Sequence, residues 1–305
     1  MLRKKQLSCL VALAIGMYAT SSHAALVTYS DFSSTAGLTL VGSTGTAVTG
    51  DGTVLRLTPA AGGQSGAAYS TTAVTLGSSS IFSTTFQFRF TRTGGIDPAD
   101  GITFVLAASP SGLGGAGVGM GYSGVPNSVA IEFDTYNNAG FGLGNNDGPS
   151  SNHVSIDTNG NLTNSAITDV YGNGSCGFPG GWPSQNSNAT AGCMSNGDLW
   201  TATIGYDGSK LSVELFDPAE GASFLAINNY AIDIGAYLGT NQAYVGFTSG
   251  TGAGWENHDI VNWQFDNTTK LAPRSVPEPT TIALMGLGLA GLGFARRRKS
   301  LFTIF

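Results

Sequence analysis

The chain has 305 residues, of which 41% are apolar and only 10% are charged, and its formal net charge is −6 at pH 7. Most of its basic residues lie at the two ends, so residues 25–276 hold six basic and eighteen acidic residues, a net charge of −12. So acidic a body has little with which to neutralise phosphates, which argues against nucleic-acid binding. It is suited instead to a calcium-rich exterior.

The first 24 residues have the pattern of a secretory signal peptide. Residues 3–5 are basic, residues 7–18 are mainly apolar, and residues 22–24 form a small-residue cleavage site. We therefore expect export across an inner membrane and read the fold from the residues that follow.

Between residues 26 and 270, short apolar or alternating runs are separated by clusters of Gly, Asn and Ser, and no long segment has helical periodicity. The expected strands include residues 84–90, 101–107, 128–133, 153–157, 199–206, 211–216 and 243–248. Regular alternation of strands and turns is typical of an antiparallel β-sandwich, and about 240 residues can form one such domain. The sequence thus predicts a single all-β domain over residues 25–270.

One short stretch concentrates the side chains that bind metal ions. The apolar run 129–131 predicts a buried strand, and Glu132 and Asp134 then share a face because alternate strand side chains point the same way. Two adjacent carboxylates repel each other unless a cation lies between them. The oxygen donors that suit calcium are Asp134, the carbonyl of Tyr136, Asn138 and Asp147.

A second ion is predicted beside the first. Glu132 and His153, with Asp134 and Asp147 as bridges, suit manganese or another transition metal. The alternative interpretation of residues 137–152 is a loop of Asx turns, in which Asn and Asp side chains cap their own backbone.

Two cysteines remain after signal removal, Cys176 and Cys193. An even pair in an oxidising compartment predicts a disulfide, which ties the Gly- and Asn-rich loop 171–197. Closing so short a loop contributes roughly 3 kcal/mol in the chain-entropy account. Two free buried thiols are the alternative.

The C-terminal end carries a second targeting pattern. Val-Pro-Glu-Pro at 276–279 precedes an apolar stretch and then four basic residues at 296–299. The stretch is shorter than the roughly 20 apolar residues of a permanent membrane span. Basic residues after such a stretch tend to stay in the cytoplasm, so the body of the protein is expected outside it. This arrangement resembles the PEP-CTERM sorting signal of Gram-negative bacteria. The resemblance implies a linker at 271–279, a sorting or anchor segment at 280–299 in transient or permanent contact with the inner membrane, and an exosortase as partner. A plain anchor helix is the alternative.

The metal-rich stretch resembles the core of the L-type, legume-lectin-like lectins. Glu-Phe-Asp-Thr-Tyr-x-Asn from Glu132, then Asp147, then His-Val-Ser-Ile-Asp from His153 follow that family's pattern in order. Four further segments agree: residues 99–106, 112–122, 245–249 and 258–265. The resemblance implies a concanavalin-A-like jelly roll and calcium-dependent, non-catalytic carbohydrate binding. The interval from Asp147 to His153 is one residue longer than in most plant lectins.

The resemblance also implies a sugar site around Asp100. This carboxylate is expected to accept two sugar hydroxyls, and the Ala99–Asp100 bond is expected to be cis and held by calcium. Asn138 is expected to serve both ligands, with its carbonyl oxygen on calcium and its amide group on the sugar. Gly114 or Gly115 is expected to offer a backbone N–H, because glycine lets a ligand approach closely.

The loop of residues 249–256 is expected to close the sugar site, with Ser249 and Trp255 as its candidate contacts. Trp255 and Tyr136 are equally compatible with stacking on a sugar ring and with ordinary packing. Trp263 and Phe265, on the closing strand, are interpreted as packing residues. The expected ligand is exopolysaccharide or another glycan, and the expected location is the cell envelope or the exterior.

Two other functions compete with that of a lectin. Concanavalin-A-like sandwiches also host glycoside hydrolases, whose retaining members need two carboxyl groups about 5–5.5 Å apart. In laminarinase-type enzymes the pattern Glu-x-Asp-x-x-Glu supplies them, but Tyr136 and Asn137 stand where the second Glu is needed, so no catalytic residue is predicted. The third interpretation is a structural matrix protein that binds calcium only for stability.

Overall fold

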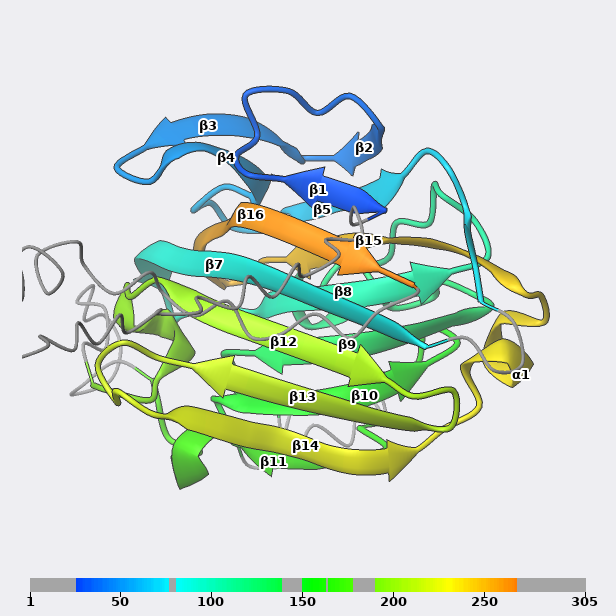
Figure 1. Ribbon diagram of the computed structural model, residues 1–305. Coiled ribbons are helices and arrows are strands. Elements are labelled where there is room, and N and C mark those ends of the chain that lie inside the picture. Colours follow the sequence, from blue (N-terminus) through cyan, green and yellow to red (C-terminus); the bar gives the residue numbers. More distant parts are fainter. Residues whose placement is uncertain (1–25, 77–80, 139–149, 163, 178–189, 268–305) are drawn as a thin grey trace, which may run out of the picture.

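The computed structural model (Figure 1) describes residues 26–76, 81–138, 150–162, 164–177 and 190–267. The predicted signal peptide, the predicted linker and sorting segment, and Asp147 lie outside these residues. Two antiparallel sheets of eight strands each face one another and form a jelly-roll sandwich. In the described part of the chain, α1 (Ile234–Leu238) is the one α-helix. None of the described helices is long and apolar enough to cross a membrane.

Each sheet combines strands that are distant in the sequence. Sheet 1 runs in the order β14 (Ser223–Ala231), β13 (Lys210–Phe216), β12 (Trp200–Tyr206), β7 (Phe82–Gly95), β16 (Gly254–Asp266), β4 (Gly52–Thr58) and β3 (Gly45–Thr49), with β1 (Val27–Tyr29) on β16. Sheet 2 runs in the order β11 (Ile167–Asp169), β10 (His153–Thr158), β9 (Ser128–Asp134), β8 (Gly101–Ala107), β15 (Gln242–Gly250), β5 (Ser65–Ser70) and β2 (Leu38–Gly42), with β6 (Val74–Thr75) on β15. All seven strands expected from the sequence are present.

The core between the sheets is built from aromatic rings. The ring of Phe86 on β7 has its centroid 4.9 Å from that of Phe247 on β15 and 5.7 Å from that of Phe133 on β9. Rings from both sheets therefore interdigitate, as their alternation along the strands predicts. Trp263 and Phe265 are fully buried in the same cluster, which confirms their packing role.

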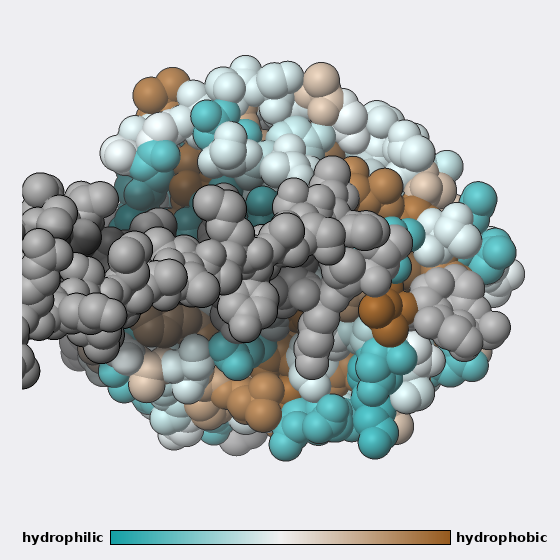
Figure 2. Space-filling view, in the orientation of Figure 1, coloured by the Kyte–Doolittle hydropathy of each residue, from teal (hydrophilic) through white to brown (hydrophobic). Residues whose placement is uncertain are grey.

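The outer face of sheet 1 carries polar side chains that form hydrogen bonds and an ion pair with one another. Asn262 donates a hydrogen bond to Gln87, which in turn donates to Thr201, so side chains of three strands are linked across the sheet. Arg56 and Asp259 form an ion pair at 2.7 Å on the same sheet. Figure 2 views the molecule from this side, and its coloured part shows hydrophilic and apolar residues interspersed.

The outer face of sheet 2 is covered by the glycine-rich segment of residues 112–122. Met120 and Tyr122 of this segment pack with Tyr69 and Val105 of the sheet in a second apolar cluster. Tyr69 also donates a hydrogen bond through its hydroxyl to the carbonyl of Gly112 at 2.8 Å. The segment is thereby fixed beside the ends of β8 and β9, where the predicted site residues lie.

Candidate functional site

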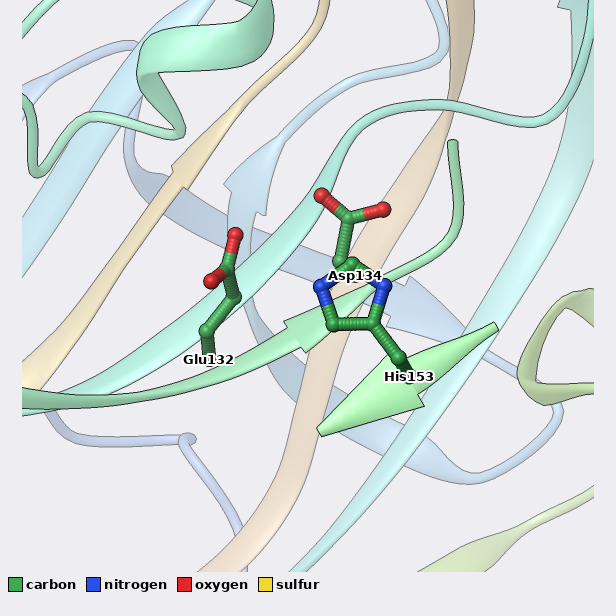
Figure 3. Close-up of side chains that lie close together, drawn as sticks. All are labelled: Glu132, Asp134 and His153. Atoms are coloured by element: carbon green, nitrogen blue, oxygen red, sulfur yellow. The ribbon is translucent and has the colours of Figure 1, made fainter. Parts of the chain in front are cut away.

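Glu132, Asp134 and His153 come together on the outer face of sheet 2 (Figure 3). In the β9–β10 pair, Asp134 lies opposite His153 and Glu132 lies opposite Ser155, so the three ligand side chains point to one side. One ligand atom from each lies within 4.8 Å of the other two. All three residues are at most 1% exposed. The structure thus brings together three of the four residues that the sequence predicts for the second metal site.

The electrostatics of this cluster favour a bound cation. Burial raises the pKa of Glu132 well above its usual value, and the charges of Asp157 and Asp134 raise it further. Burial lowers the pKa of His153 to about 4. At neutral pH the imidazole is therefore uncharged and has a lone pair for a metal ion. A cation held between these groups relieves the repulsion between the carboxylates, so the residues fit the predicted metal.

Sequence reasoning missed two members of this cluster, Ser155 and Asp157. The Ser155 hydroxyl donates to Glu132 at 2.5 Å, and Asp157, which is fully buried, accepts a 2.9 Å hydrogen bond from the backbone of Asn164. Both residues share a face of β10 with His153 because they follow it at two and four positions. The alternation His-x-Ser-x-Asp in the sequence is the signal that could have placed Ser155 and Asp157 beside His153.

The chain that leaves β9 carries the predicted calcium ligands. Asp134 accepts a 2.7 Å hydrogen bond from the backbone N–H of Tyr136, which turns the chain directly after the strand. Asn138 follows and is 9% exposed. These three residues lie within one turn, while Asp147, the fourth predicted ligand, is outside the described residues.

Asp100 lies beside this turn and its backbone is held on both sides. The Ala99–Asp100 peptide bond is cis, as the resemblance implies. The Asp100 N–H donates to the carbonyl of Gly250 at 3.1 Å, and the Asp100 carbonyl accepts from the N–H of Thr135 at 2.9 Å. Asp100 thus connects the end of β15 with the residue that follows Asp134.

The phenol of Tyr136 lies in the same neighbourhood. Its pKa is raised first by burial and then by the negative charges of Asp97 and Asp100. Asp100 and the turn from Asp134 to Asn138 therefore form one continuous region.

Two glycines flank the carboxylate of Asp100. A Cβ atom on Gly252 would lie 3.4 Å from Asp100 Oδ2, and one on Gly117 would lie 4.0 Å from the same oxygen. Gly114, predicted from the sequence, packs instead against the backbone of the following turn, and its N–H donates to the carbonyl of Gly121. The structure thus brings Gly117 and Gly252, which the sequence did not single out, to the carboxylate.

The two candidates of the closing loop lie differently. Ser249 is fully buried, and its hydroxyl donates to the carbonyl of Gly101 at 2.9 Å, so it supports the backbone next to Asp100. Trp255 is half-buried, and its ring packs over Gly94 and Gly95 of β7.

The predicted disulfide between Cys176 and Cys193 is present, with Cα atoms 5.6 Å apart. It holds the segment that packs against the start of β10. Asn152 donates to the carbonyl of Gly192 at 2.7 Å and accepts from the N–H of Met194 at 3.0 Å. Since Asn152 precedes His153, the disulfide-tied segment borders the candidate metal-binding cluster.

Comparison with known proteins identifies the family. The sequence matches the legume lectin domain over residues 25–280 and the PEP-CTERM protein-sorting motif over residues 275–299. The chain belongs to the legume lectin family. This family and fold imply carbohydrate binding, and legume lectins bind metal ions such as calcium and manganese. The PEP-CTERM motif indicates export and sorting to the cell envelope.

Solved legume lectins share the fold of this domain. The lectin from Bauhinia forficata in complex with GalNAc is 23% identical, with 80% of this chain and 98% of that chain covered and a TM-score of 0.60. Lectin I-B4 from Griffonia simplicifolia, in a metal-free form, is 24% identical over 79% of this chain and 98% of that chain, with a TM-score of 0.61. Peanut lectin, with a 9-mer peptide, is 25% identical over 78% and 95%, with a TM-score of 0.58. No curated protein sequence matches the chain significantly.

Proposed function

We propose that the protein is a calcium-dependent, non-catalytic lectin that binds exopolysaccharide or other glycans at the bacterial cell surface. The hydrogen bond from Thr135 to Asp100 carries the proposal, because it joins the proposed sugar carboxylate to the residue after Asp134. Legume lectin membership gives the carbohydrate class, and the acidic body suits a calcium-rich exterior.

Two ions are proposed to organise the site. Calcium is held by Asp134, the Tyr136 carbonyl, Asn138 and Asp147. Manganese or another transition metal is held by Glu132 and His153, with Asp134 and Asp147 shared between the ions. These ions neutralise the negative charges of the buried carboxylates.

The sugar is proposed to bind over Asp100. Its carboxylate accepts two hydroxyls in charge-assisted hydrogen bonds, and the Asn138 amide donates to a third group. Because the N–H of Gly114 is engaged by Gly121, Gly115 is the proposed backbone donor of that pair. Gly117 and Gly252 keep side chains away from the carboxylate.

The closing loop is proposed to shape the rim of the sugar site. Trp255 of this loop and Tyr136, which follows β9, are the aromatic candidates for contact with a sugar ring. Ser249 acts beneath the site, because its buried hydroxyl holds the Gly101 carbonyl.

The C-terminal motif supports processing by an exosortase-type enzyme near residues 277–279, with contact to the inner membrane before processing. The lectin body is then retained at the envelope or released. Export by the N-terminal signal peptide is part of the same proposal.

A glycoside hydrolase is disfavoured by the position of the paired carboxyl groups. Glu132 and Asp134 are at most 1% exposed and lie against His153, so a polysaccharide has no access to them. A hydrolase needs its two carboxyl groups on either side of an accessible glycosidic bond.

A glycan array probed in calcium and then in chelator tests the proposal. GalNAc- and galactose-containing glycans are the first to examine, because the Bauhinia lectin was solved with GalNAc and the lectin UEA-II with galactose. We expect binding in calcium that chelator abolishes. We expect Asp134→Asn to abolish binding of calcium and glycan together, and Asp100→Asn to abolish glycan binding alone.

Two other outcomes contradict the proposal. Protection from heat by calcium without any glycan signal indicates a structural matrix protein. Release of reducing ends from β-glucans by the purified protein indicates a hydrolase.

A further inference from the structure

Glu256 and His258 form a buried pair between the two sheets. Both residues are on β16 and have no exposed surface, and Glu256 Oε1 lies 3.4 Å from His258 Nε2. The pairing of β16 with β7 shifts register between Trp255 and Asn257, at the position of Glu256. Burying an ionisable pair costs free energy unless hydrogen bonds compensate, so the partners of each residue indicate what the pair does.

The partners of Glu256 lead to one side of Asp100. Its Oε1 atom accepts a hydrogen bond from the Thr135 hydroxyl at 2.8 Å and another from the Ser195 hydroxyl at 3.0 Å. The backbone N–H of Thr135 donates to the Asp100 carbonyl at 2.9 Å. The carboxylate of Glu256 therefore fixes the side chain of the residue that holds the Asp100 carbonyl.

The partners of His258 lead to the other side of Asp100. His258 Nδ1 lies 2.7 Å from the Thr58 hydroxyl, which lies 2.8 Å from the Ser249 hydroxyl. The Ser249 hydroxyl is 2.9 Å from the carbonyl of Gly101, the residue that follows Asp100. The chain of hydrogen bonds thus ends on the peptide after Asp100.

The donor and acceptor in each of these hydrogen bonds follow from the carbonyl of Gly101, which ends the chain. A carbonyl oxygen only accepts, so Ser249 donates to Gly101. Thr58 then donates to Ser249, and His258 Nδ1–H donates to Thr58. With Nδ1 as the donor, Nε2 is the ring atom that lies 3.4 Å from Glu256 Oε1, so the two branches adjoin at this pair of side chains.

We propose that Glu256 and His258 are positioning residues that fix the backbone on both sides of Asp100. Glu256 acts through Thr135 on the Asp100 carbonyl, and His258 acts through Thr58 and Ser249 on the Gly101 carbonyl. The pair thereby sets the direction of the Asp100 carboxylate without contact with the ligand. The benefit for sugar binding rests on the proposed function of Asp100, but the effect on the backbone does not.

Amide hydrogen exchange of the full, calcium-loaded protein tests the backbone effect without any sugar. Thr135→Val removes the hydroxyl but keeps the side-chain shape, and Glu256→Leu removes the carboxylate. We expect the amides of Asp100 and Thr135 to exchange about tenfold faster in both variants. Glu256→Gln retains an oxygen acceptor for the two hydroxyls, so its exchange should stay near that of the wild type.

Thr84→Val is the matched control, because Thr84 is as buried as Thr135 and its hydroxyl also donates a hydrogen bond, to the carbonyl of Gln264. Thr84 lies near the start of β7, at the opposite end of this strand from Gly95, which packs beside the closing loop. We expect a lower Tm in this variant without a local rise of exchange at Asp100. The inference is overturned if exchange at Asp100 is unchanged in Thr135→Val, or if Thr84→Val raises it equally. This comparison decides even where Glu256→Leu fails to fold.

Glycan binding is the second readout, with the glycans that the wild type binds on the array as probes. We expect Thr135→Val to weaken binding about tenfold at saturating calcium and to leave calcium affinity unchanged. Unchanged glycan affinity with altered exchange would overturn the link to the sugar. A wild type that binds no glycan contradicts the proposed function, whereas the exchange measurement still decides the positioning role.

Discussion

The backbone N–H of Thr135 donates a 2.9 Å hydrogen bond to the carbonyl oxygen of Asp100. Thr135 directly follows Asp134, which lies with Glu132 and His153 in the candidate metal-binding cluster. One hydrogen bond therefore separates the proposed metal ligands from the backbone of the proposed sugar carboxylate. Displacement of the end of β9 must act on Asp100, so metal and sugar binding are expected to be coupled.

Calcium is expected to raise the Tm of the wild type through Asp134. A ligand present at a hundred times its Kd stabilises the folded state by about 2.7 kcal/mol. Asp134→Asn should lose this calcium-dependent shift, because the amide removes the negative charge that the cation neutralises. Asp100→Asn is the matched control and should keep the shift. Differential scanning calorimetry with calcium and with chelator measures both, and an undiminished shift in Asp134→Asn contradicts the assigned ligand.

Gly252→Ala is expected to weaken glycan binding while calcium binding is kept. The added Cβ would lie 3.4 Å from Asp100 Oδ2 and 3.2 Å from the Cα of Gly117, so it occupies space beside the carboxylate. We expect a loss of glycan affinity of about tenfold or more. Gly205→Ala on β12 is the control, because its Cβ would have no atom within 4 Å. Titration calorimetry with a glycan that the wild type binds checks this, and equal effects of the two substitutions would refute it.

The pH dependence of stability is expected to report on His153. Its pKa is lowered to about 4 in the folded state, mainly by burial, from an ordinary value of 6.5. Between these values the unfolded chain binds a proton that the folded chain does not. The contribution is therefore fully present above pH 6.5 and is lost as the pH falls toward 4. Over this window the loss amounts to about 3 kcal/mol.

Chelator-treated wild type and His153→Asn isolate this contribution. Denaturant unfolding from pH 7 to pH 4 gives the free energy of unfolding of each, and their difference should shift against the wild type as the pH falls. The comparison is needed because the raised pKa of Glu132 has the opposite effect in both proteins. A difference that does not change with pH would show that His153 is protonated in the folded state as easily as in the unfolded chain.

The parts of the site that sequence could predict are those encoded locally. Glu132 and Asp134 share a face because they are two residues apart on one strand, and that rule needs no knowledge of the fold. The resemblance implied that His153 joins Glu132 in a metal site, and the structure places His153 at the start of the strand that pairs with β9. The aromatic alternation of β7 likewise predicted its buried face.

The parts that sequence could not predict depend on pairing between distant segments. The pair Glu256 and His258 connects to Thr135 and Thr58 only because β16 lies beside β4 in one sheet and Glu256 contacts the residue that follows β9 of the other sheet. The choice of Gly117 among many glycines depends on how its segment lies over sheet 2. Ser249 is a candidate sugar contact in the sequence, yet the strand alternation that buries Phe247 also buries Ser249 two residues later.

Removal of the disulfide is expected to lower stability without loss of calcium binding. The bond joins residues 17 positions apart, and closing a loop of this size contributes about 3 kcal/mol in the chain-entropy account. The double substitution Cys176→Ser and Cys193→Ser should therefore lower the Tm, and the reduced wild type is its control. The calcium-dependent shift should persist, because the turn from Asp134 to Asn138 has its own hydrogen bond to the backbone of Tyr136. If the folded variant instead loses the calcium-dependent shift of Tm, the disulfide-tied segment itself holds the turn from Asp134 to Asn138 in place.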